Sequence, residues 1–395
     1  MRILVINSGS SSIKFSMFET GHEVGAGEPV SVYEGEVGGV GTAKAAVRFV
    51  DAGGKDLRGD EVAVQAATPL EAIGLVVRLV TRDGLPRVEA VGYRVVHPGA
   101  KLDRHQRITE EVLRELEAAK EFAPLHDPEA VKIIREMMGR FAGVAHYACF
   151  DTVFHETMPE VAKRYPIAVA WRERGVRRYG FHGLSCESVV WQMRKAGEVP
   201  KRMVIAHLGS GCSVTAVVEG RSVDTTMGLT PTGGVVMGTR PGDLDPGLML
   251  FLLRQEGATA ESVEQMLNHE AGLKGLCGLN DMRAIREAAE KGDAAAVLAV
   301  DSFCRSVRKA VAGFAATAGM DALVFTGGIG EHDARTRSAV AAGVWGDGPV
   351  LDAAANEAKG GGVRRISGAG IGVFVVPAAE DLMIARHVAR LSASE

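Results

Sequence analysis

Two stretches of the chain repeat one pattern of apolar and polar residues. Residues 2–6 (RILVI) are apolar, residues 7–12 (NSGSSS) are small and polar, and residues 13–18 (IKFSMF) are again mainly apolar. This pattern predicts two short strands joined by a Ser-rich hairpin tip. Residues 203–218 repeat the order, with MVIAHL and SVTAVV on either side of Gly209-Ser210-Gly211. We interpret the two stretches as a weak internal repeat.

Helical signals occur in three other places. Asp127-Pro128-Glu129 has the composition of a helix start, with a capping side chain, a proline in the first turn and an acidic residue behind it. Residues 294–318 have a helical period that stops at Gly319, and residues 380–391 have the pattern of an amphipathic helix. These segments predict three helices.

A strand and a glycine-rich turn are predicted directly after the longest of these helices. Residues 321–325 (DALVF) form a short apolar run that continues into residues 326–330 (TGGIG). Helix, strand and glycine turn in this order indicate an α/β crossover unit. The fold class predicted from these patterns is therefore α/β.

The length of the chain favours two domains. A chain of 395 residues with 46% hydrophobic and 24% charged residues is too long for one comfortable core and has an ordinary globular composition. No low-complexity linker separates the halves, so the order of the motifs places the boundary near residue 150. We expect domains over residues 1–150 and 151–380, with a C-terminal helix over 381–395 completing the first.

Charge and cysteine usage narrow the class of partner. The formal net charge is −4, and there is no basic stripe or polybasic run, so we expect no nucleic acid and no membrane surface as partner. The N-terminus does not resemble a secretory signal, and no apolar stretch is long enough to span a bilayer, so we expect a cytoplasmic protein. Five cysteines are widely spaced and predict reduced, mostly buried thiols: Cys149, Cys186, Cys212, Cys277 and Cys304.

Glycine is the informative excess in the composition. The chain has 49 glycines, clustered at 207–211, 228–247, 272–278 and 327–330, where the backbone can approach a ligand closely. Two polar hairpin tips and one strand-to-glycine turn provide three places where backbone N–H groups can converge on phosphates. Each alone is more often an ordinary turn, but three in one chain favour a nucleotide.

The order of these elements resembles the sugar kinase, Hsp70 and actin superfamily, and eight longer motifs resemble the acetate kinase family over Ile3 to Arg386. The motifs are NSGSSSIKF at 7–15, GYRVVHPG at 92–99, APLHDP at 123–128, FDTVFHETMP at 150–159, RRYGFHG at 177–183, HLGSGCS at 207–213, MGLTPTGG with MGTRPGDLDPG at 227–247, and FTGGIGEH at 325–332. The resemblance implies two ribonuclease H-like domains, the second binding nucleotide, with an active-site cleft between them. It also implies a homodimer and a direct, reversible, in-line transfer of the ATP γ-phosphoryl group to acetate.

Phosphorylation of a carboxylate requires cations that hold two anions together. Arg94 and Arg240 are the candidates, because guanidinium groups match carboxylate and phosphoryl oxygens in a bidentate way. The resemblance makes them the substrate and transition-state arginines, and it makes His182 the donor to the transferring phosphoryl group and Asp151 the catalytic aspartate. Without the resemblance, salt bridges, a core histidine and a helix cap would be the ordinary readings of these residues. We expect Asp151 to order Mg²⁺ water or orient an arginine.

The remaining site residues are assigned by the same resemblance. Asn7 and Glu380 match the two magnesium positions, where Mn²⁺ is a possible substitute, and Glu380 would also suit a helix N-terminus. The acyl substrate would contact Arg94, Val96, Leu125, His126, Phe181 and Pro231. The nucleotide ATP or ADP would contact Ser10, Ser12, Lys14, His207, Leu208, Gly209, Ser210, Gly211, Asp281, Met282, Arg283, Gly328, Ile329, Gly330, Glu331 and His332. Glycines in the last segment leave room for a purine, which favours ATP over pyrophosphate as the donor.

Several positions depart from the family pattern, and they leave alternatives open. The departures are Pro98, Leu184, Cys186, Ser210, Gly233 and His332, and most of them cluster near the expected acyl pocket. One methylene in such a pocket discriminates by only about 1–3 kcal/mol, so a propionate or butyrate kinase is an alternative. A catalytically silent nucleotide-binding relative and a sugar kinase or chaperone ATPase are the others. Because the motifs are divided between the two halves, we also expect domain closure during catalysis.

Overall fold

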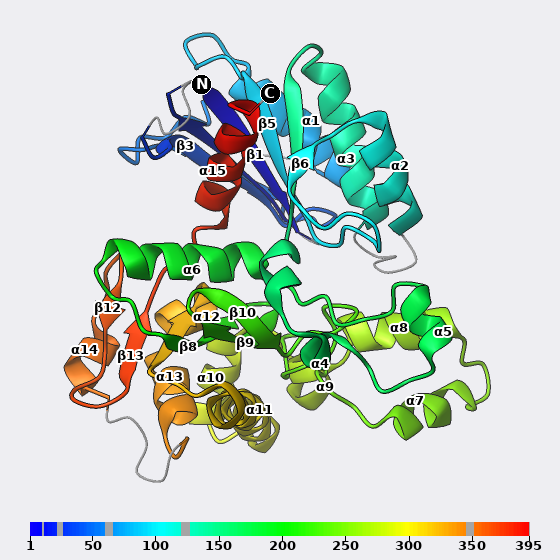
Figure 1. Ribbon diagram of the computed structural model, residues 1–395, viewed down its shortest axis with the longest axis vertical. Helices are drawn as coiled ribbons and strands as arrows, with labels where there is room; N and C mark the ends of the chain where they lie inside the picture. Colours follow the sequence, from blue (N-terminus) through cyan, green and yellow to red (C-terminus); the bar gives the residue numbers. More distant parts are fainter. Residues whose placement is uncertain (10–11, 22–26, 60–65, 120–126, 345–350, 395) are drawn as a thin grey trace. The chain divides into compact units, whose positions relative to one another are not determined.

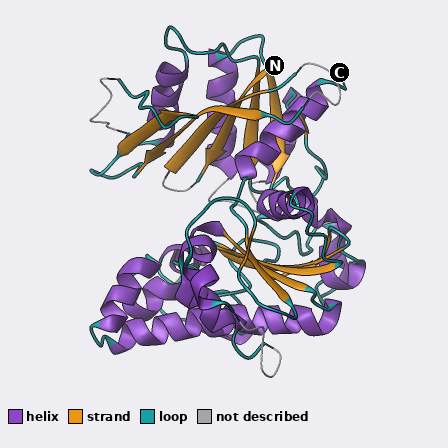
Figure 2. Ribbon diagram, turned by 90° about the vertical axis from the view of Figure 1, so that its left-hand side faces the viewer, coloured by secondary structure: helices purple, strands orange, loops and turns teal. Residues whose placement is uncertain are grey.

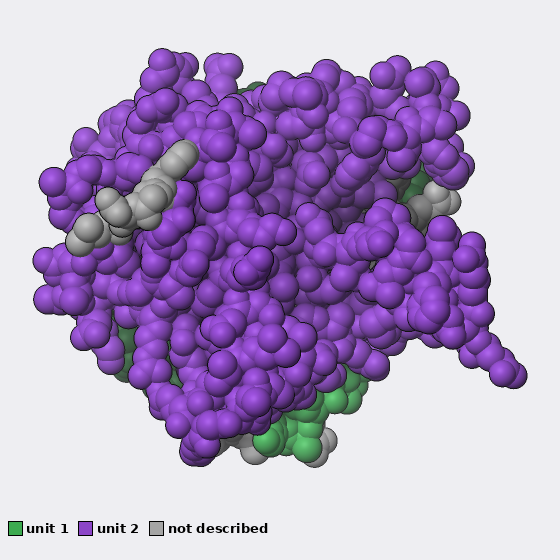
Figure 3. Space-filling view, turned by 90° about the horizontal axis from the view of Figure 1, so that it is seen from below, with its two compact units in different colours: residues 1–153, 379–395 green, residues 154–378 purple. Residues whose placement is uncertain are grey.

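The computed structural model describes residues 1–395 except 10–11, 22–26, 60–65, 120–126, 345–350 and 395, and it leaves the side chains of residues 127 and 128 undescribed. The chain forms two compact units, which Figure 3 distinguishes by colour. Unit 1 comprises residues 1–153 and 379–395, and unit 2 comprises residues 154–378. Among the described residues, no helix combines the length and the apolar character needed to cross a bilayer.

Unit 1 is a seven-stranded mixed sheet with helices on both faces (Figures 1 and 2). The strand order is β4-β3-β2-β1-β5-β7-β6, in which β1, β5 and β7 run parallel and the other neighbours are antiparallel. Its elements are β1 (Arg2–Ser8), β2 (Ser12–Glu19), β3 (Val30–Gly38), β4 (Ala46–Asp51), α1 (Pro69–Val80), β5 (Ala90–Val95), β6 (Gln106–Arg107), α2 (Glu110–Ala118), α3 (Asp127–Arg140), β7 (Ala145–Phe150) and α15 (Glu380–Ser392).

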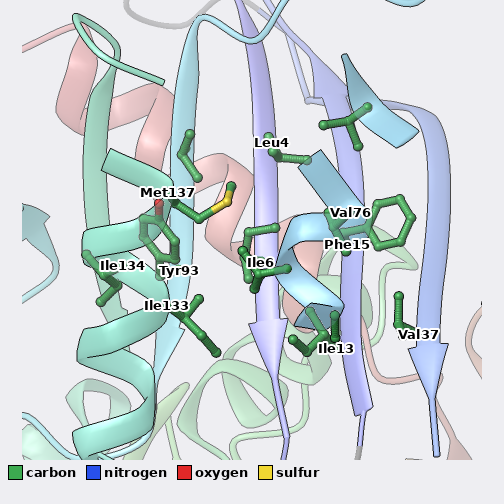
Figure 4. Packing of buried hydrophobic residues seen from close by; sticks show 14 of the residues in the cluster. Leu4, Ile6, Ile13, Phe15, Val37, Val76, Tyr93, Ile133, Ile134 and Met137 are labelled. Carbon is green, nitrogen blue, oxygen red and sulfur yellow. The ribbon is translucent and has the colours of Figure 1, made fainter. Parts of the chain in front are cut away.

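The apolar run of β1 is explained by burial of both faces of the sheet. Leu4 and Ile6 point to the face covered by α1 and α3, where they join the main hydrophobic cluster of unit 1 (Figure 4). Ile3 and Val5, which alternate with them, are fully buried on the opposite face, where α15 packs on β1 and β5. A Cβ atom on Gly92 of β5 would lie 2.7 Å from methyl groups of α15, so this close packing requires glycine.

Unit 2 repeats the central part of this topology. Its sheet has the order β10-β9-β8-β11-β13-β12, in which β8, β11 and β13 run parallel and the outer pairs are antiparallel. Helix α6 covers one face and α11 the other (Figures 1 and 2). In both units an antiparallel hairpin is therefore followed by parallel strands, which extends the internal repeat predicted from the two hairpins.

The elements of unit 2 are η2 (Val153–Thr157, a short 3₁₀ helix at the boundary), α4 (Glu160–Lys163), α5 (Val169–Glu173), α6 (Gly183–Lys195), β8 (Arg202–Leu208), β9 (Cys212–Val218), β10 (Arg221–Thr225), α7 (Pro246–Leu253), α8 (Ala260–His269), α9 (Gly272–Cys277), α10 (Met282–Glu290), α11 (Ala294–Ala318), β11 (Ala322–Thr326), α12 (Gly327–His332), α13 (Ala334–Ala341), α14 (Ala353–Glu357), β12 (Arg364–Arg365) and β13 (Gly372–Val375).

Most local predictions agree with this structure, and one is corrected. Both hairpins and the three helices are confirmed. The glycine turn predicted at residues 326–330 is wrong in its extent, because helix α12 begins at Gly327, immediately after β11. The change of direction takes place at Gly327 alone, whose positive φ of 77° favours glycine. All five cysteines are free thiols, and four of them are buried, as predicted.

Candidate active site

In unit 1, three polar side chains meet where parallel strands end. Asn7 lies near the end of β1, Arg94 near the end of β5, and Asp151 directly after β7. Because the carboxyl ends of neighbouring parallel strands lie at one edge of a sheet, residues distant in sequence are brought together there. Nη2 of Arg94 donates a 2.5 Å hydrogen bond to Oδ2 of Asp151, and Nη1 of Arg94 lies 3.5 Å from Oδ1 of Asn7.

The first turn of α15 adds two carboxylates to this edge. Nδ2 of Asn7 donates to Oε2 of Glu380 at 3.1 Å and to Oδ1 of Asp381 at 3.2 Å. Oγ of Ser16 on β2 donates to the other Asp381 oxygen at 2.6 Å. Burial raises the pKa of Asp381, and the hydrogen bonds from Ser16 and Asn7 oppose that rise.

Arg94 stays charged in this setting. Burial disfavours its charged form, but the carboxylates of Asp151 and Glu380 more than compensate and hold the pKa of Arg94 above its ordinary value. Asp151 is fully buried, and Nε of Arg94 lies 3.7 Å from the Glu380 carboxylate. The guanidinium of Arg94 is thus held in place by Asp151, directly after β7, and by Glu380 on α15.

The oxygens of this cluster suit a hard divalent cation. Two carboxylates and a side-chain amide are the kind of ligands that Mg²⁺ accepts alongside several waters, and the buried Asp381 carboxylate would gain from a nearby cation. Lys14 lies opposite Asn7 in the β1–β2 register, with its exposed side chain close enough to lower the pKa of Asp381. The predicted residues Asn7 and Glu380 therefore fit magnesium.

Three other predicted residues of this part of the chain, Ser10, Leu125 and His126, lie outside the described residues. Ser12 begins β2, and its carbonyl accepts a 2.8 Å hydrogen bond from the Gly9 amide, which closes the hairpin tip. Val96 follows β5 and is half-buried.

In unit 2, His182 has an unusual backbone conformation at the start of α6. Its φ of 58° is in the left-handed region, which a residue with a side chain occupies at a cost of about 1–3 kcal/mol. Its Nδ1 lies 2.9 Å from Oγ of Ser213 on β9. This contact orients the ring so that Nε2 faces the tip of the β8–β9 hairpin.

Gly211 at that tip separates His182 from Arg240. A Cβ atom on Gly211 would lie 2.8 Å from Nη2 of Arg240 and 3.2 Å from Nε2 of His182. The two nitrogens therefore converge on one small region, and only a residue without a side chain leaves it open. Nη1 of Arg240 donates a 2.7 Å hydrogen bond to the carbonyl of Pro231, which fixes the direction of the guanidinium.

Two further histidines support this arrangement. The ring of His207 stacks on that of His182, with centroids 4.1 Å apart, and its Nδ1 lies 2.8 Å from Oγ of Ser185. Nε2 of the buried His155 lies 2.9 Å from the carbonyl of Phe181, the residue before His182. Gly180 has a φ of 77° and leaves room for the His155 ring.

The expected nucleotide residues of unit 2 lie around the same hairpin tip. A Cβ atom on Gly209 would lie 3.9 Å from the backbone N of Gly328, so the start of α12 is beside the tip. The Gly238 amide donates to the Ser210 carbonyl at 3.3 Å, and Gly238 also packs against Asn280, next to Asp281. A Cβ atom on Gly328 would meet nothing within 4 Å, so open space remains there.

Several of these predicted residues have structural partners of their own. Asp281 caps α10 and pairs with the exposed Arg283 at 2.6 Å, while the Met282 side chain is buried. Oε1 of Glu331 accepts hydrogen bonds from the amides of Gly327 and Ala378, and His332 is exposed. Leu208, Phe181 and Pro231 are also buried.

Sequence reasoning missed four residues that hold the site together. Asp381 and Ser16 are polar residues in otherwise apolar or helical segments, and this was the only local signal for them. His155 stands within a motif that was recognised, but no role was assigned to it. Arg337 is 2% exposed, and its guanidinium donates to the carbonyls of Gly330 and Glu331 at the end of α12.

Comparison with known proteins gives consistent similarities. The model of the acetokinase family matches residues 2–386. An acetate kinase of Deinococcus radiodurans is 42% identical over 399 aligned residues, which cover 98% of each chain. The crystal structure of Porphyromonas gingivalis acetate kinase matches with a TM-score of 0.84 at 32% identity, covering 99% of both chains. That of a propionate kinase from Francisella tularensis matches with a TM-score of 0.88 at 33% identity, also covering 99% of both.

Proposed function

This chain belongs to the acetokinase family, and from that premise we propose that it transfers the γ-phosphoryl group of ATP reversibly to acetate, giving acetyl phosphate and ADP. The observation that carries the proposal is the convergence of His182 Nε2 and Arg240 Nη2 on the bare backbone of Gly211. A hydrogen-bond donor and a guanidinium beside a glycine hairpin tip can stabilise the charge on a transferring phosphoryl group.

The residues of unit 1 supply the complementary chemistry. Arg94 presents a permanently charged fork that can hold a carboxylate in a bidentate way. Asp151 is buried, and its strong hydrogen bond to Arg94 supports a role in orienting this arginine, one of the two roles expected from the sequence. Mg²⁺, or Mn²⁺ in its place, would be held at Asn7 and Glu380 and would neutralise charge on the ATP phosphates.

The test of this proposal is direct detection of the acyl phosphate. Purified protein is incubated with ATP, Mg²⁺ and acetate, propionate or butyrate, and the acyl phosphate is trapped with hydroxylamine. We expect a hydroxamate product with acetate and none from an Arg240→Ala variant. No product with any of the three acids, from folded protein that still binds ATP, would instead indicate a silent nucleotide-binding relative.

A second substrate is favoured by one specific observation. The solved propionate kinase is as similar to this chain in sequence as the solved acetate kinase is, and its TM-score is higher. The departures from the family pattern near Phe181 and Pro231, at Leu184, Cys186 and Gly233, also favour a change in the acyl pocket. We therefore propose that propionate is also accepted, and a specificity ratio above about 200 for acetate would exceed what one methylene provides.

We also propose that the protein forms a homodimer through unit 2. Helix α7 (PGLMLFLL) is apolar on all sides, yet it contributes no buried residue. Leu250 is 54% exposed and Phe251 59% exposed. A helix that is apolar all round is normally buried, and exposed apolar patches commonly mark protein interfaces. Helix α5, which lies in the same part of unit 2 as α7 in Figure 1, adds the exposed Trp171.

Light scattering tests this assembly. We expect twice the mass of 41.7 kDa at micromolar concentration. Leu250→Glu with Phe251→Glu should shift the protein to the monomer, because two charges would be buried in the interface. Val199→Glu, at a position that is 70% exposed and distant in sequence, is the control and should leave the mass unchanged. A monomeric parent protein would contradict the proposal.

For the location of the reaction we propose the cytoplasm. All five cysteines are free thiols, which is consistent with a reducing compartment. Acetate and ATP are the only partners that the reaction requires, besides the cation and the second subunit.

A further inference from the structure

Unit 2 contains a cavity that none of the site residues above lines. Its volume is about 620 Å³, within the range of small-molecule pockets. One wall is a face of α11, on which Ser302, Arg305, Ser306, Lys309 and Phe314 follow one another at helical spacing. The opposite wall is formed by the end of β10 and by residues 234–243, here called the arginine loop because it carries Arg240.

The charges on the wall of the cavity favour an anion. Arg305 and Lys309 are exposed, one turn apart on α11, and neither has an ion-pair partner within the part of the chain that the structure describes. Arg178 adds a third cation and is bonded mainly to carbonyls of residues 225–227. The wall also holds two acids, and each already accepts a backbone hydrogen bond: Asp243 from the Gly234 amide at 2.7 Å and Asp224 from the Thr225 amide at 2.8 Å. Three cations therefore face two acids in the wall.

The other lining residues suggest an organic ligand instead of a simple ion. Val236, Pro241 and Phe314 give the cavity an apolar part beside the cations. The volume also exceeds what a phosphate or an acetate ion needs. An acidic head group on an apolar body would use both parts of the wall.

The arginine loop connects this cavity to the active site. Its base is closed by a 2.9 Å hydrogen bond from the Asp243 amide to the Gly234 carbonyl, and the Val236 amide donates to Oγ of Ser306 on α11 at 3.1 Å. Further along the loop, the Met237 amide donates to the Arg240 carbonyl at 2.9 Å. A ligand that displaces Val236 from α11 would therefore also shift Arg240, through the hydrogen bond between Met237 and Arg240.

We propose that the cavity binds a small organic anion, with its carboxylate or phosphate head between Arg305 and Lys309, and that its occupancy changes turnover through the arginine loop. This is a regulatory site distinct from the acetate and ATP sites, and it does not depend on which acyl substrate is used. The site consists of exposed cations on one face of α11, serine hydroxyls beside them, and a loop that is hydrogen-bonded to the same helix.

The binding test uses dianions that share one apolar body. Phenyl phosphate and phthalate are titrated by calorimetry without Mg²⁺ or nucleotide, in an Arg240→Ala background that removes binding at the active-site arginine. Inorganic phosphate and benzyl alcohol test the head and the body alone. We expect one of the two dianions to bind more tightly than either part, and the better one identifies the head group.

Two variants decide where the probe binds. Arg305→Gln with Lys309→Gln should weaken binding about five- to tenfold, since exposed charge pairs contribute modestly. The control is Arg221→Gln with Lys291→Gln, which removes the same two charges at exposed positions outside the cavity and should change nothing. Equal binding to both variants, or no binding of any probe at 10 mM (about 2.7 kcal/mol of affinity), would overturn the proposal.

The regulatory part has its own readout. With the native arginine at 240, the bound dianion should change kcat in a way that saturating ATP and acetate do not reverse, and the Arg305 and Lys309 double variant should lose this effect while keeping its basal activity. Tight binding with unchanged kinetics would refute the coupling through the arginine loop.

Discussion

Replacing Gly211 by alanine should damage catalysis while leaving the fold intact. The added Cβ atom would lie 2.8 Å from Nη2 of Arg240 and 3.2 Å from Nε2 of His182, whereas real Cβ contacts rarely come closer than about 3.4 Å. The guanidinium must therefore retreat by about 0.6 Å, the difference between 2.8 and 3.4 Å. Both contacts are to ends of side chains, so the backbone of the hairpin can stay in place.

The magnitude follows from the sensitivity of catalysis to geometry. A misplacement of about 1 Å can cost on the order of 100-fold in rate, so we expect kcat to fall about 10- to 100-fold, or ~1.4–2.7 kcal/mol of transition-state stabilisation. The free energy of unfolding should change by less than about 1 kcal/mol, because Gly211 has no positive φ to strain and alanine reduces the entropy of the unfolded chain.

Steady-state kinetics and urea unfolding measure the two quantities separately. Gly139→Ala on α3 is the control for substitution itself, because a Cβ atom there meets nothing within 4 Å. Gly328→Ala is the second comparison: its Cβ atom also meets nothing in the protein, and it should raise KM for ATP more than it lowers kcat. If Gly211→Ala kept more than about a third of wild-type kcat, a loss under ~0.7 kcal/mol, the convergence of Arg240 and His182 would not be catalytic.

Three further predictions address other parts of the molecule. Arg94→Lys and Arg240→Lys should each retain less than about a tenth of turnover in steady-state kinetics, because lysine lacks the bidentate fork. Lysine is the preferred substitution at position 94, because alanine would leave the buried Asp151 carboxylate without its cation. Burial lowers the pKa of His105 to about 2, and the nearby His387 and Arg390 add to this effect. Below about pH 6.5, the ordinary pKa of histidine, the unfolded chain binds a proton at His105 that the folded protein does not, so the free energy of unfolding should fall by about 2 kcal/mol between pH 6.5 and 5. Urea titrations of His105→Gln should lose this slope. Cys277, the half-buried thiol, should react with a thiol reagent in the folded protein before the four buried ones, and fast modification of more than one thiol per chain would contradict the buried assignments.

The sequence predicted elements best where one local pattern dominates. The hairpins of β1–β2 and β8–β9 and the long helix α11 have unbroken periodicity and sharp ends, so local reasoning sufficed. The glycine cluster directly after the predicted strand indicates a turn, because glycine is common in turns. There, Gly327 provides only the change of direction, and α12 follows at once.

Contacts between distant residues could not be derived in this way. The network of Asn7, Ser16 and Asp381 joins two strands of the first hairpin to a helix more than 360 residues later, and no local pattern indicates it. The family resemblance supplied Asn7 and Glu380 but not Asp381, the second carboxylate that accepts from the Asn7 amide. The strained backbone of His182 is likewise set by its surroundings, since Gly180, His155 and Ser213 fix the turn before α6.

The position of α15 in the chain has a consequence for synthesis on the ribosome. Unit 2 is one continuous segment, but unit 1 is interrupted, because its last helix follows residue 378. At about 5–20 residues per second, roughly 10–50 seconds separate β7 from α15 during translation. Over that interval Ile3 and Val5 on the sheet of unit 1 lack the helix that buries them, so this apolar face of the sheet is left uncovered. A chain released before Glu380 would carry a complete second unit but would lack Glu380 and Asp381, the two α15 carboxylates beside Asn7.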